Sequence, residues 1–238
     1  MNRYTYDLHV HSCLSPCGDN DMTPANIAGM AFLNGLNAIA LTDHNTVKNC
    51  SALKKAAEQY GITVLYGMEL TTDEEVHIVC LFADEKSANE WGDFVYSKLQ
   101  KIKNNPDIFG KQIIMNETDS VLGEEPYLLI NAVNLSFEEV FDKVLSLGGI
   151  AFPAHVDKNA NSLISNLGFV PPDSDFTVAE LHDLNKLEGI SASHPYFKNC
   201  KILCNSDAHY LPDIHLNEHF LECDENTPEC IINTLKTK

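Results

Sequence analysis

The sequence lacks long apolar segments. Its 238 residues contain no run of eighteen consecutive apolar residues, whereas a membrane-spanning helix needs about 20. The first residues, Met-Asn-Arg-Tyr-Thr-Tyr-Asp, form no apolar signal region, so secretion is not indicated. These absences predict a cytoplasmic protein without a membrane partner.

Basic residues are also scarce. The chain holds 16 Lys and Arg against 34 Asp and Glu, which gives a formal net charge of -18. A protein that binds a long nucleic acid needs a basic stripe for the phosphates, so we expect no such partner. A small phosphorylated substrate is still compatible with this charge, because bound divalent cations can dominate the electrostatics of a site.

Several sequence patterns of other enzyme classes are missing. No Gly-x-Gly-x-x-Gly or phosphate-loop pattern occurs, which argues against an open nucleotide-binding sheet. No Gly-x-Ser-x-Gly pattern occurs either, so no serine nucleophile is indicated. Eight cysteines are present, but most lie in apolar runs (Cys80, Cys204) or beside the motifs described below (Cys13, Cys17). We interpret them as free thiols in a reducing compartment.

Strand-like and helix-like segments alternate along most of the chain. Helices are expected at 24–35, 46–60, 86–103, from 137 to about 148, and at the C-terminus; strands are expected at 4–10, 38–41, 63–66, 76–82, 149–153, 176–181, 202–205 and 219–223. This alternation favours a parallel sheet with crossover helices. Because the strands are short and apolar, a closed barrel is favoured over a half-exposed sheet.

Local signals mark the starts of two helices and one segment that departs from the alternation of strands and helices. Thr23 is the expected N-cap of the first helix, with Pro24 at its first position. Ser136 and Glu139 have the spacing of a capping box. Residues 104–135 fit the alternation poorly, because they contain Asn104-Asn105-Pro106 and two glycines. We expect a surface excursion there, within one barrel domain over residues 1–238.

Side chains of the metal-ligand type recur in six motifs, and five of these close a strand-like run. They are His9 with His11, His44, Glu69, His77, His155, and Asp207 with His209. Only His77 lies inside its run, and on its own it would more often be a satisfied core histidine. Ligands at the ends of successive strands are how a barrel builds a site at one rim.

The types and spacing of these residues point to a metal centre. His9 and His11 stand two residues apart on a strand, so both rings point to one face. Glu69 follows an apolar strand, where a carboxylate is costly to bury unless it is paired or binds a metal. Imidazole together with carboxylate suits zinc, manganese or iron, whereas magnesium prefers oxygen ligands alone.

In combination, the motifs resemble the PHP (polymerase and histidinol phosphatase) family of metal-dependent phosphoesterases. The resemblance runs from Asp7 to about His215 and rests on Asp-Leu-His-Val-His-Ser, Thr-Asp-His, Gly-Met-Glu, Val-His, Pro-Ala-His and Asn-Ser-Asp-Ala-His. It implies an α/β fold, a distorted (β/α)7 TIM-like barrel. It also implies two or three divalent transition metals, zinc, manganese or iron, at the strand ends.

The resemblance further implies how the ligands are shared. One metal would be bound by His9, His11, Glu69 and Asp207. Glu69 would bridge to a second metal, held by His77 and His155. A third metal would be held by His44, His209 and a residue of the loop after the first motif.

This loop ligand departs from the family pattern. In phosphatases of the family it is a His or Asp soon after the first motif, but here the loop is longer than usual. Asp19 is the expected ligand, and Asp21 and Cys17 are the alternatives.

Other residues near the motifs have two open interpretations. Lys158, His182 and His194 could contact a substrate phosphate at the rim, or each could be an ordinary surface residue. Asp7 and Asp43 could orient the ligand histidines, or they could cap or pair with the backbone.

The expected function is hydrolysis of a small phosphate monoester by attack of a metal-bound hydroxide. The catalytic centre would comprise His9, His11, Glu69 and Asp207. Two alternatives are a phosphodiesterase or exonuclease acting on short oligonucleotides, and a regulatory module that retains metals without turnover. The leaving group, the metal and the oligomeric state do not follow from the sequence.

Overall fold

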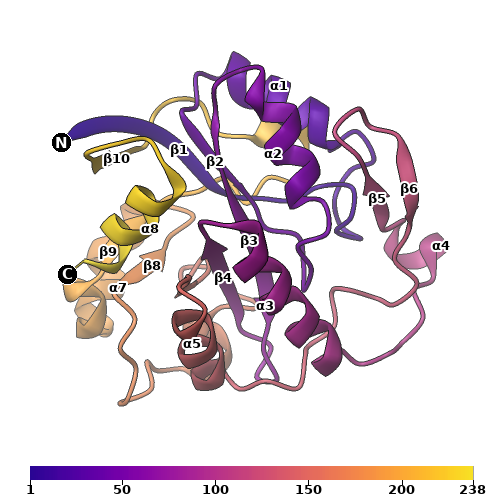
Figure 1. Ribbon diagram of the computed structural model, residues 1–238. Coiled ribbons are helices and arrows are strands. Elements are labelled where there is room, and N and C mark those ends of the chain that lie inside the picture. The colour runs from indigo at the N-terminus through magenta and orange to yellow at the C-terminus, as the bar shows by residue number, and fades with distance from the viewer. Residues whose placement is uncertain (238) are drawn as a thin grey trace.

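The computed structural model describes residues 1–237, and its largest sheet has six strands in the order β10-β1-β2-β3-β4-β7 (Figure 1). They are β1 (Asn2–Val10), β2 (Ala38–Leu41), β3 (Thr63–Thr71), β4 (His77–Phe82), β7 (Ile150–Pro153) and β10 (Phe220–Cys223). The first three strands pair in parallel, whereas β4 is antiparallel to both β3 and β7. The expectation of a parallel sheet is therefore wrong at β4 and also at β10, which pairs antiparallel with β1.

Two further strands continue the sheet toward a barrel. They pair in parallel with each other and are β8 (Val178–Glu180) and β9 (Lys201–Leu203). Val156, just after β7, donates its backbone N–H to the carbonyl of Glu180 at 2.9 Å. Leu8 of β1 donates its N–H to Asn205 Oδ1 at 2.8 Å, just beyond β9. Seven strands thus follow one another around a distorted barrel, and β10 adds to the outer side of β1.

Five helices overlap the expected segments, whereas α6 (Leu163–Leu167) and α7 (Leu187–Ser193) were not expected from the sequence. The five are α1 (Pro24–Leu33), α2 (Cys50–Glu58), α3 (Glu85–Lys98), α5 (Phe137–Ser146) and α8 (Pro228–Lys236). The Thr23 side chain accepts from the backbone of Asn26, and Ser136 forms the expected capping box with Glu139. None of the helices within residues 1–237 is long and apolar enough to cross a membrane.

The stretch between residues 104 and 135 is more ordered than expected. It contains the short helix α4 (Pro106–Phe109) and a hairpin of β5 (Ile113–Met115) and β6 (Val121–Glu124), seen at the right in Figure 1. Ile113 and Met115 form a small buried cluster with Cys13. The hairpin therefore lies against the loop that follows β1.

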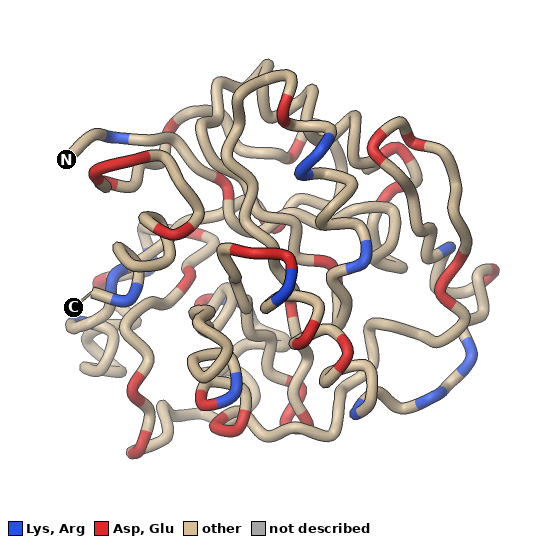
Figure 2. The backbone as a smooth tube through the Cα atoms, in the orientation of Figure 1, with Lys and Arg blue, Asp and Glu red and all other residues tan. Residues whose placement is uncertain are grey.

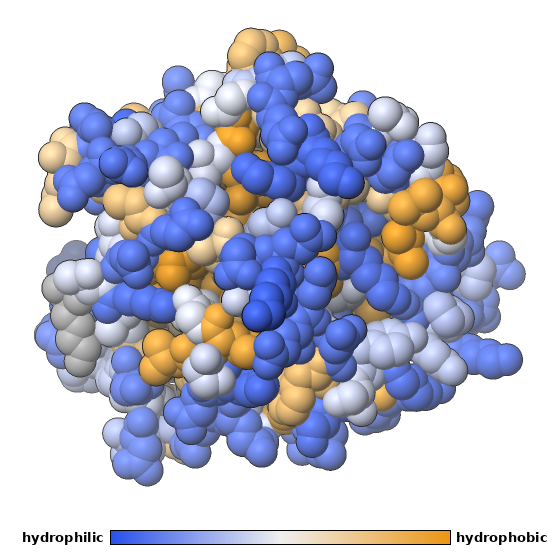
Figure 3. All heavy atoms as spheres, in the orientation of Figure 1, coloured by the Kyte–Doolittle hydropathy of each residue, from blue (hydrophilic) through white to orange (hydrophobic). Residues whose placement is uncertain are grey.

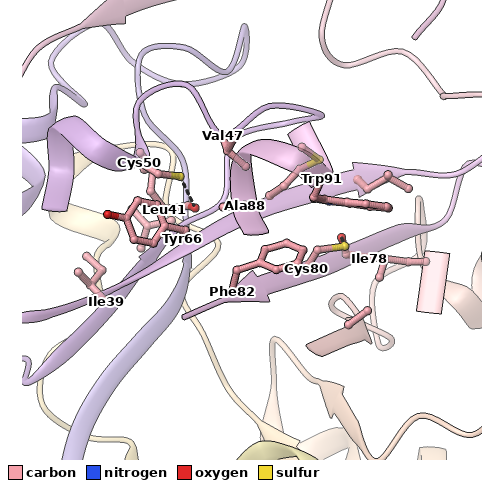
Figure 4. Close-up of a cluster of buried hydrophobic side chains, with 14 of the residues drawn as sticks. Ile39, Leu41, Val47, Cys50, Tyr66, Ile78, Cys80, Phe82, Ala88 and Trp91 are labelled. Atoms are coloured by element: carbon pink, nitrogen blue, oxygen red, sulfur yellow. Dashed lines mark hydrogen bonds between the residues drawn. The ribbon is translucent and has the colours of Figure 1, made fainter. Parts of the chain in front are cut away.

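Two apolar layers sandwich the strands. One fills the barrel and includes Leu65, Val79 and Phe152. The other lies between the strands and the helices, where Phe82 and Trp91 approach with ring centroids 6.4 Å apart (Figure 4). The face in Figure 3 is mostly hydrophilic, with apolar patches between the polar side chains.

An irregularity in β1 determines which way its histidines point. Tyr6 and Leu8 belong to the layer inside the barrel, but Val10 belongs to the layer under the helices. Simple alternation would put all three on one face. The β1–β2 register shifts between Asp7 and Val10, as in a β-bulge, which adds one residue and reverses the faces. His9 and His11 consequently turn into the barrel mouth.

Candidate metal centre

Glu69 lies at the middle of the centre. On β3, Leu65 and Glu69 stand four residues apart on the barrel-facing side, and Glu69 is 1% exposed. Five imidazole nitrogens lie close to its carboxylate. For Oε1 the distances are 2.8 Å to His77 Nδ1, 3.1 Å to His155 Nε2 and 3.3 Å to His9 Nε2; for Oε2 they are 3.2 Å to both His11 Nε2 and His44 Nδ1. A carboxylate placed in this way can be shared between metal ions.

The antiparallel direction of β4 explains His77. His77 is the first residue of β4 and shares the barrel-facing side of that strand with Val79. Because β4 runs against its neighbours, its amino end lies at the rim where their carboxyl ends meet. The sequence pattern suggested a histidine inside an apolar run, whereas the structure brings it to the same rim as the other candidates.

Asp207 faces the two histidines of β1. Its Oδ1 atom lies 3.3 Å from His9 Nε2 and 3.2 Å from His11 Nε2. The backbone of Asp207 has a φ of 53° and that of His155 a φ of 28°. Residues other than glycine adopt such values at a conformational cost. The fold maintains these backbone angles at two of the positions that line the centre.

The described residues contain three groups whose candidate donor atoms all lie within 4.8 Å of one another. They are His9, His11, Glu69 and Asp207; His44, Glu69 and His77; and His11, His44 and His209. These groups share members and form one continuous cluster. The structure therefore brings together the strand-end residues that the sequence pattern singled out, with His155 joined to it through Glu69.

The first loop places its candidates differently. Within residues 1–237 the clusters include none of the three loop candidates, Asp19, Asp21 and Cys17. Asp19 Oδ1 accepts from the backbone N–H of Asp21 at 2.8 Å. Asp21 is exposed. Cys17 instead has its Sγ 3.1 Å from His209 Nε2. The loop thus turns a thiol, and not a carboxylate, toward the histidines.

A cavity of about 470 Å³ opens onto the cluster and is lined by Cys17, His44, Glu69, His77, Ile130, His155, Lys158, Asn159, Ala160, Asn161, Asp207 and His209. Of the three candidates for phosphate contact, only Lys158 lies on this cavity, where its ammonium pairs with Asp207 Oδ2. His182 is exposed, and its backbone N–H donates to Asp157. His194 lines a different depression, beside Ile190.

Glu180 belongs to the site but was not found from the sequence. It ends β8, is 1% exposed, and accepts from His9 Nδ1 at 3.0 Å and from Asn205 Nδ2 at 2.7 Å. Its Oε1 also accepts the backbone N–H of His155 at 3.0 Å. The only sequence signal was a carboxylate at the end of a short apolar strand, in the motif Val-Ala-Glu.

Asp43 and Asp7 both bond to surrounding donors. Asp43 accepts from the backbone and the hydroxyl of Ser12 and from Ser15 Oγ, which contacts His11 Nδ1 at 2.9 Å. It therefore orients a candidate ligand through Ser15. Asp7 accepts the backbone N–H groups of Ser206, which belongs to the last motif, and of His215. Of its two expected roles, Asp7 therefore has the pairing with backbone.

Buried carboxylates raise the pKa values of the two histidines of β1. Burial lowers the pKa of His9, but Glu180, Glu69 and Asp207 outweigh it and hold this pKa well above its usual value. The same opposition raises the pKa of His11 to about 9. Neighbouring histidines in turn outweigh burial and hold the pKa of Glu69 and of Asp207 well below the usual range. The carboxylates therefore require positive charge at the centre.

The other side of the cluster favours neutral imidazole. Burial holds the pKa of His44 well below its usual value, despite the attraction of Glu69. Burial together with the charge of His11 lowers the pKa of His209 to about 4. Neutral imidazole is the form that binds metals.

Two buried polar atoms that lack a hydrogen-bond partner support the fit of this site to metal ions. His44 Nδ1 and Asp207 Oδ1 are buried and have no hydrogen-bond partner among the described residues. Buried polar atoms normally have a partner, and a divalent cation between the groups would provide one. Neutral imidazole and carboxylate together suit zinc, manganese and iron, so the donor set fits divalent transition metals.

Comparison with known proteins identifies the family. The model of the PHP domain family matches residues 7–145, more than half of the chain. The 5'-3' exoribonuclease of Haemophilus influenzae is 36% identical over 83 residues, which cover 34% of this chain and 29% of the relative. The matches cover half or less of the length of each of five curated relatives.

Solved structures share the fold at low sequence identity. The lesion-specific endonuclease PfuEndoQ from Pyrococcus furiosus has a TM-score of 0.68 and 20% identity, and the match covers 99% of this chain and 56% of that one. Endonuclease Q was also solved with a 27-mer duplex that has an abasic lesion at the active site (TM-score 0.67, 21% identity, 99% and 57% covered). A protein from Bifidobacterium adolescentis, provisionally assigned as a metal-dependent phosphoesterase, matches over 95% of each chain with a TM-score of 0.59 and 19% identity. The distorted TIM-like barrel is thereby confirmed.

Proposed function

The chain belongs to the PHP domain family, and we propose that it is a metal-dependent phosphoesterase that hydrolyses a small phosphate monoester. The enzyme class that the sequence indicated, a phosphoric ester hydrolase, is that of this family. The observation that carries the proposal is the position of Glu69, whose two oxygens lie within 3.3 Å of five imidazole nitrogens.

Divalent metals bound at this centre would supply positive charge to the phosphoryl oxygens and activate water for attack. The ligands proposed for them are the strand-end residues His9, His11, His44, Glu69, His77, His155, Asp207 and His209. Glu69 would be shared between two sites, and Asp207 would hold the side of the centre nearest β1. No nucleophile is required from the protein.

Residues around the ligands would hold them in place. Glu180 accepts from His9 Nδ1 and so directs His9 Nε2 toward Glu69 and Asp207. Ser15 does the same for His11, backed by Asp43. Such partners fix the tautomer and the ring orientation of ligand histidines. Lys158 at the cavity wall would meet a negatively charged phosphate.

The size and charge of the site favour a small substrate. A cavity of about 470 Å³ lies within the range of about 300–1,000 Å³ that is usual for small-molecule sites. Lys158 is the one Lys or Arg in its described lining. Basic segments are sparse along the backbone and acidic ones are frequent, as Figure 2 shows. A long nucleic acid would need several cationic phosphate contacts.

A second candidate is hydrolysis of a phosphodiester in a nucleic acid. The names of the relatives favour it, since they include an exoribonuclease and an endonuclease solved with duplex DNA. These findings count against the expectation that no long nucleic acid binds. The cavity is lined by cluster residues such as Glu69 and His209, so a chain end that enters it would reach the cluster.

Phosphate release by the metal-loaded protein tests the proposal. The substrates are a panel of phosphorylated metabolites, a chromogenic monoester, its diester counterpart, dinucleotides and single-stranded and duplex oligonucleotides. We expect monoesters to be hydrolysed fastest, with activity lost on chelation and restored by manganese or zinc. Faster cleavage of diesters or oligonucleotides would replace the first candidate by the second. No turnover of any substrate at full metal occupancy would favour a regulatory module that only retains metals.

A further inference from the structure

Cys17 lies beside the part of the centre that has the fewest acidic donors. Its Sγ is 3.1 Å from His209 Nε2, and both residues line the rim cavity. His209 belongs to the cluster with His11 and His44, which contains three imidazoles and no carboxylate. The other two clusters each contain Glu69.

The loop holds Cys17 in this place through its backbone. The carbonyl of Ser12 accepts the backbone N–H of Ser15 at 3.1 Å, and the carbonyl of Ser15 accepts that of Gly18 at 2.9 Å. A Cβ added at Gly18 would lie 2.3 Å from the Ser12 carbonyl oxygen, so this tight winding requires glycine. The next residue, Asp19, donates its N–H to the carbonyl of His209 at 2.9 Å. The chain on one side of the thiol is therefore tied directly to His209.

Neither carboxylate of the loop lines the rim cavity. Asp19 Oδ1 accepts the backbone N–H of Asp21, and Asp21 itself is exposed. The three imidazoles form a group that could hold a metal ion, and one of them has an unfilled donor atom. His44 Nδ1 is buried and has no hydrogen-bond partner among the described residues, although Glu69 Oε2 lies 3.2 Å away.

We propose that Cys17 is the loop ligand of the third metal, and that its thiolate makes this site select zinc or iron(II) over manganese. The inference rests on the metal centre proposed above and deepens it. A site of imidazoles and one thiolate is softer than a site of imidazole and carboxylate, and soft donors favour zinc over manganese. On binding, the thiol proton leaves to solvent and the sulfur bonds to the metal.

Reconstitution with cobalt(II) tests this assignment, because a thiolate bound to cobalt(II) gives a charge-transfer band in the near ultraviolet that imidazole and carboxylate do not give. The parent protein should show the band at full loading. Cys17→Ser should lose the band and lower the affinity for the third ion. The loss of affinity should exceed about 10–100-fold, which is the usual effect of removing a residue that only supports a ligand. Cys17→Asp should lose the band but keep the third ion and accept manganese more readily.

Two controls make the result specific. Cys230→Ser removes a different, partly buried thiol and should leave the band intact. Asp19→Asn removes the carboxylate that the family pattern suggests, and should leave both the band and the metal content unchanged. A band that survives Cys17→Ser, or an ion that is lost in Asp19→Asn, would overturn the assignment.

A second measurement does not depend on the variants. Mass spectrometry of the alkylated parent protein should show that zinc slows modification of Cys17 and leaves that of Cys230 unchanged. Equal rates for Cys17 with and without zinc, at full metal content, would also overturn the assignment. If the protein takes up no metal at all, the proposed metal-dependent function is wrong. That outcome differs from metal uptake without a contribution from Cys17, which overturns the Cys17 assignment alone.

Discussion

The same strands build the barrel interior and its rim, yet the side chains are apolar in the interior and titratable at the rim. On β3, Leu65 fills the interior, and Glu69 stands four residues further on the same face. On β4, Val79 is interior and His77 is at the rim. Within two to four residues, the environment changes from close-packed hydrocarbon to a cluster of buried titratable groups.

The difference shows what each region contributes. Burial of apolar area stabilises the fold by about 25 cal/mol per Å². Burial of ionised groups costs free energy unless they are paired or bind a metal. A rim of buried imidazole and carboxylate groups therefore cannot be explained by stability, and strongly shifted pKa values of this kind are typical of functional sites. The interior maintains the geometry that the rim uses.

Phe152→Ala tests the packing of the barrel interior and should have the largest effect on stability. Phe152 is fully buried in the barrel layer, so the cavity should lower the free energy of unfolding by about 3–5 kcal/mol. Urea denaturation measures the change. Phe169→Ala, at a side chain that is 54% exposed, should cost far less. Equal losses in the two variants would show that the interior is not close-packed at Phe152.

The corresponding change at the rim is Glu69→Gln. It keeps the shape but removes the charge shared by the cluster, so kcat should fall by roughly three orders of magnitude, since metal catalysis supplies several kcal/mol. The far-ultraviolet circular dichroism should stay that of the parent. Glu90→Gln, on the exposed surface of α3, is the control. Unchanged turnover and metal content in Glu69→Gln would show that this carboxylate binds no metal.

Glu180→Gln tests the junction between the two regions. Glu180 follows Val178 on the barrel-facing side of β8 and holds the His9 ring. Neutralising it should weaken the metal bound by His9 by about 10–100-fold, and titration with a competing chelator measures this. The exposed Glu188→Gln should have no effect. A variant that binds all its metals as tightly as the parent would show that Glu180 contributes only to packing.

Lys158→Gln tests the outermost part of the rim. The Lys158 side chain is 35% exposed, and partly exposed ion pairs contribute up to about 1 kcal/mol. KM for a phosphate ester should therefore rise by at most about fivefold, with kcat little changed. Steady-state kinetics against Lys55→Gln, an exposed lysine of α2, checks the effect. A large fall in kcat with an unchanged KM would assign Lys158 to the chemistry instead.

Much of this protein followed from the sequence by itself. The alternation of strands and helices, the caps at Thr23 and Ser136, and the candidate ligands at the strand ends are local features, because each depends on a few neighbouring residues. The motifs were specific enough in combination to indicate the PHP family, which the family comparison confirmed.

Tertiary structure alone decided which way the side chains point and which distant residues meet at the rim, because these features depend on how the strands pair. The bulge in β1 turns His9 and His11 inward, and no property of the motif indicates an added residue. The antiparallel direction of β4 brings His77 to the rim. Glu180 meets His9 across 171 positions of sequence. Backbone hydrogen bonds of the first loop, including that from Asp19 to the distant carbonyl of His209, bring Cys17 beside His209, and local spacing does not reveal this contact.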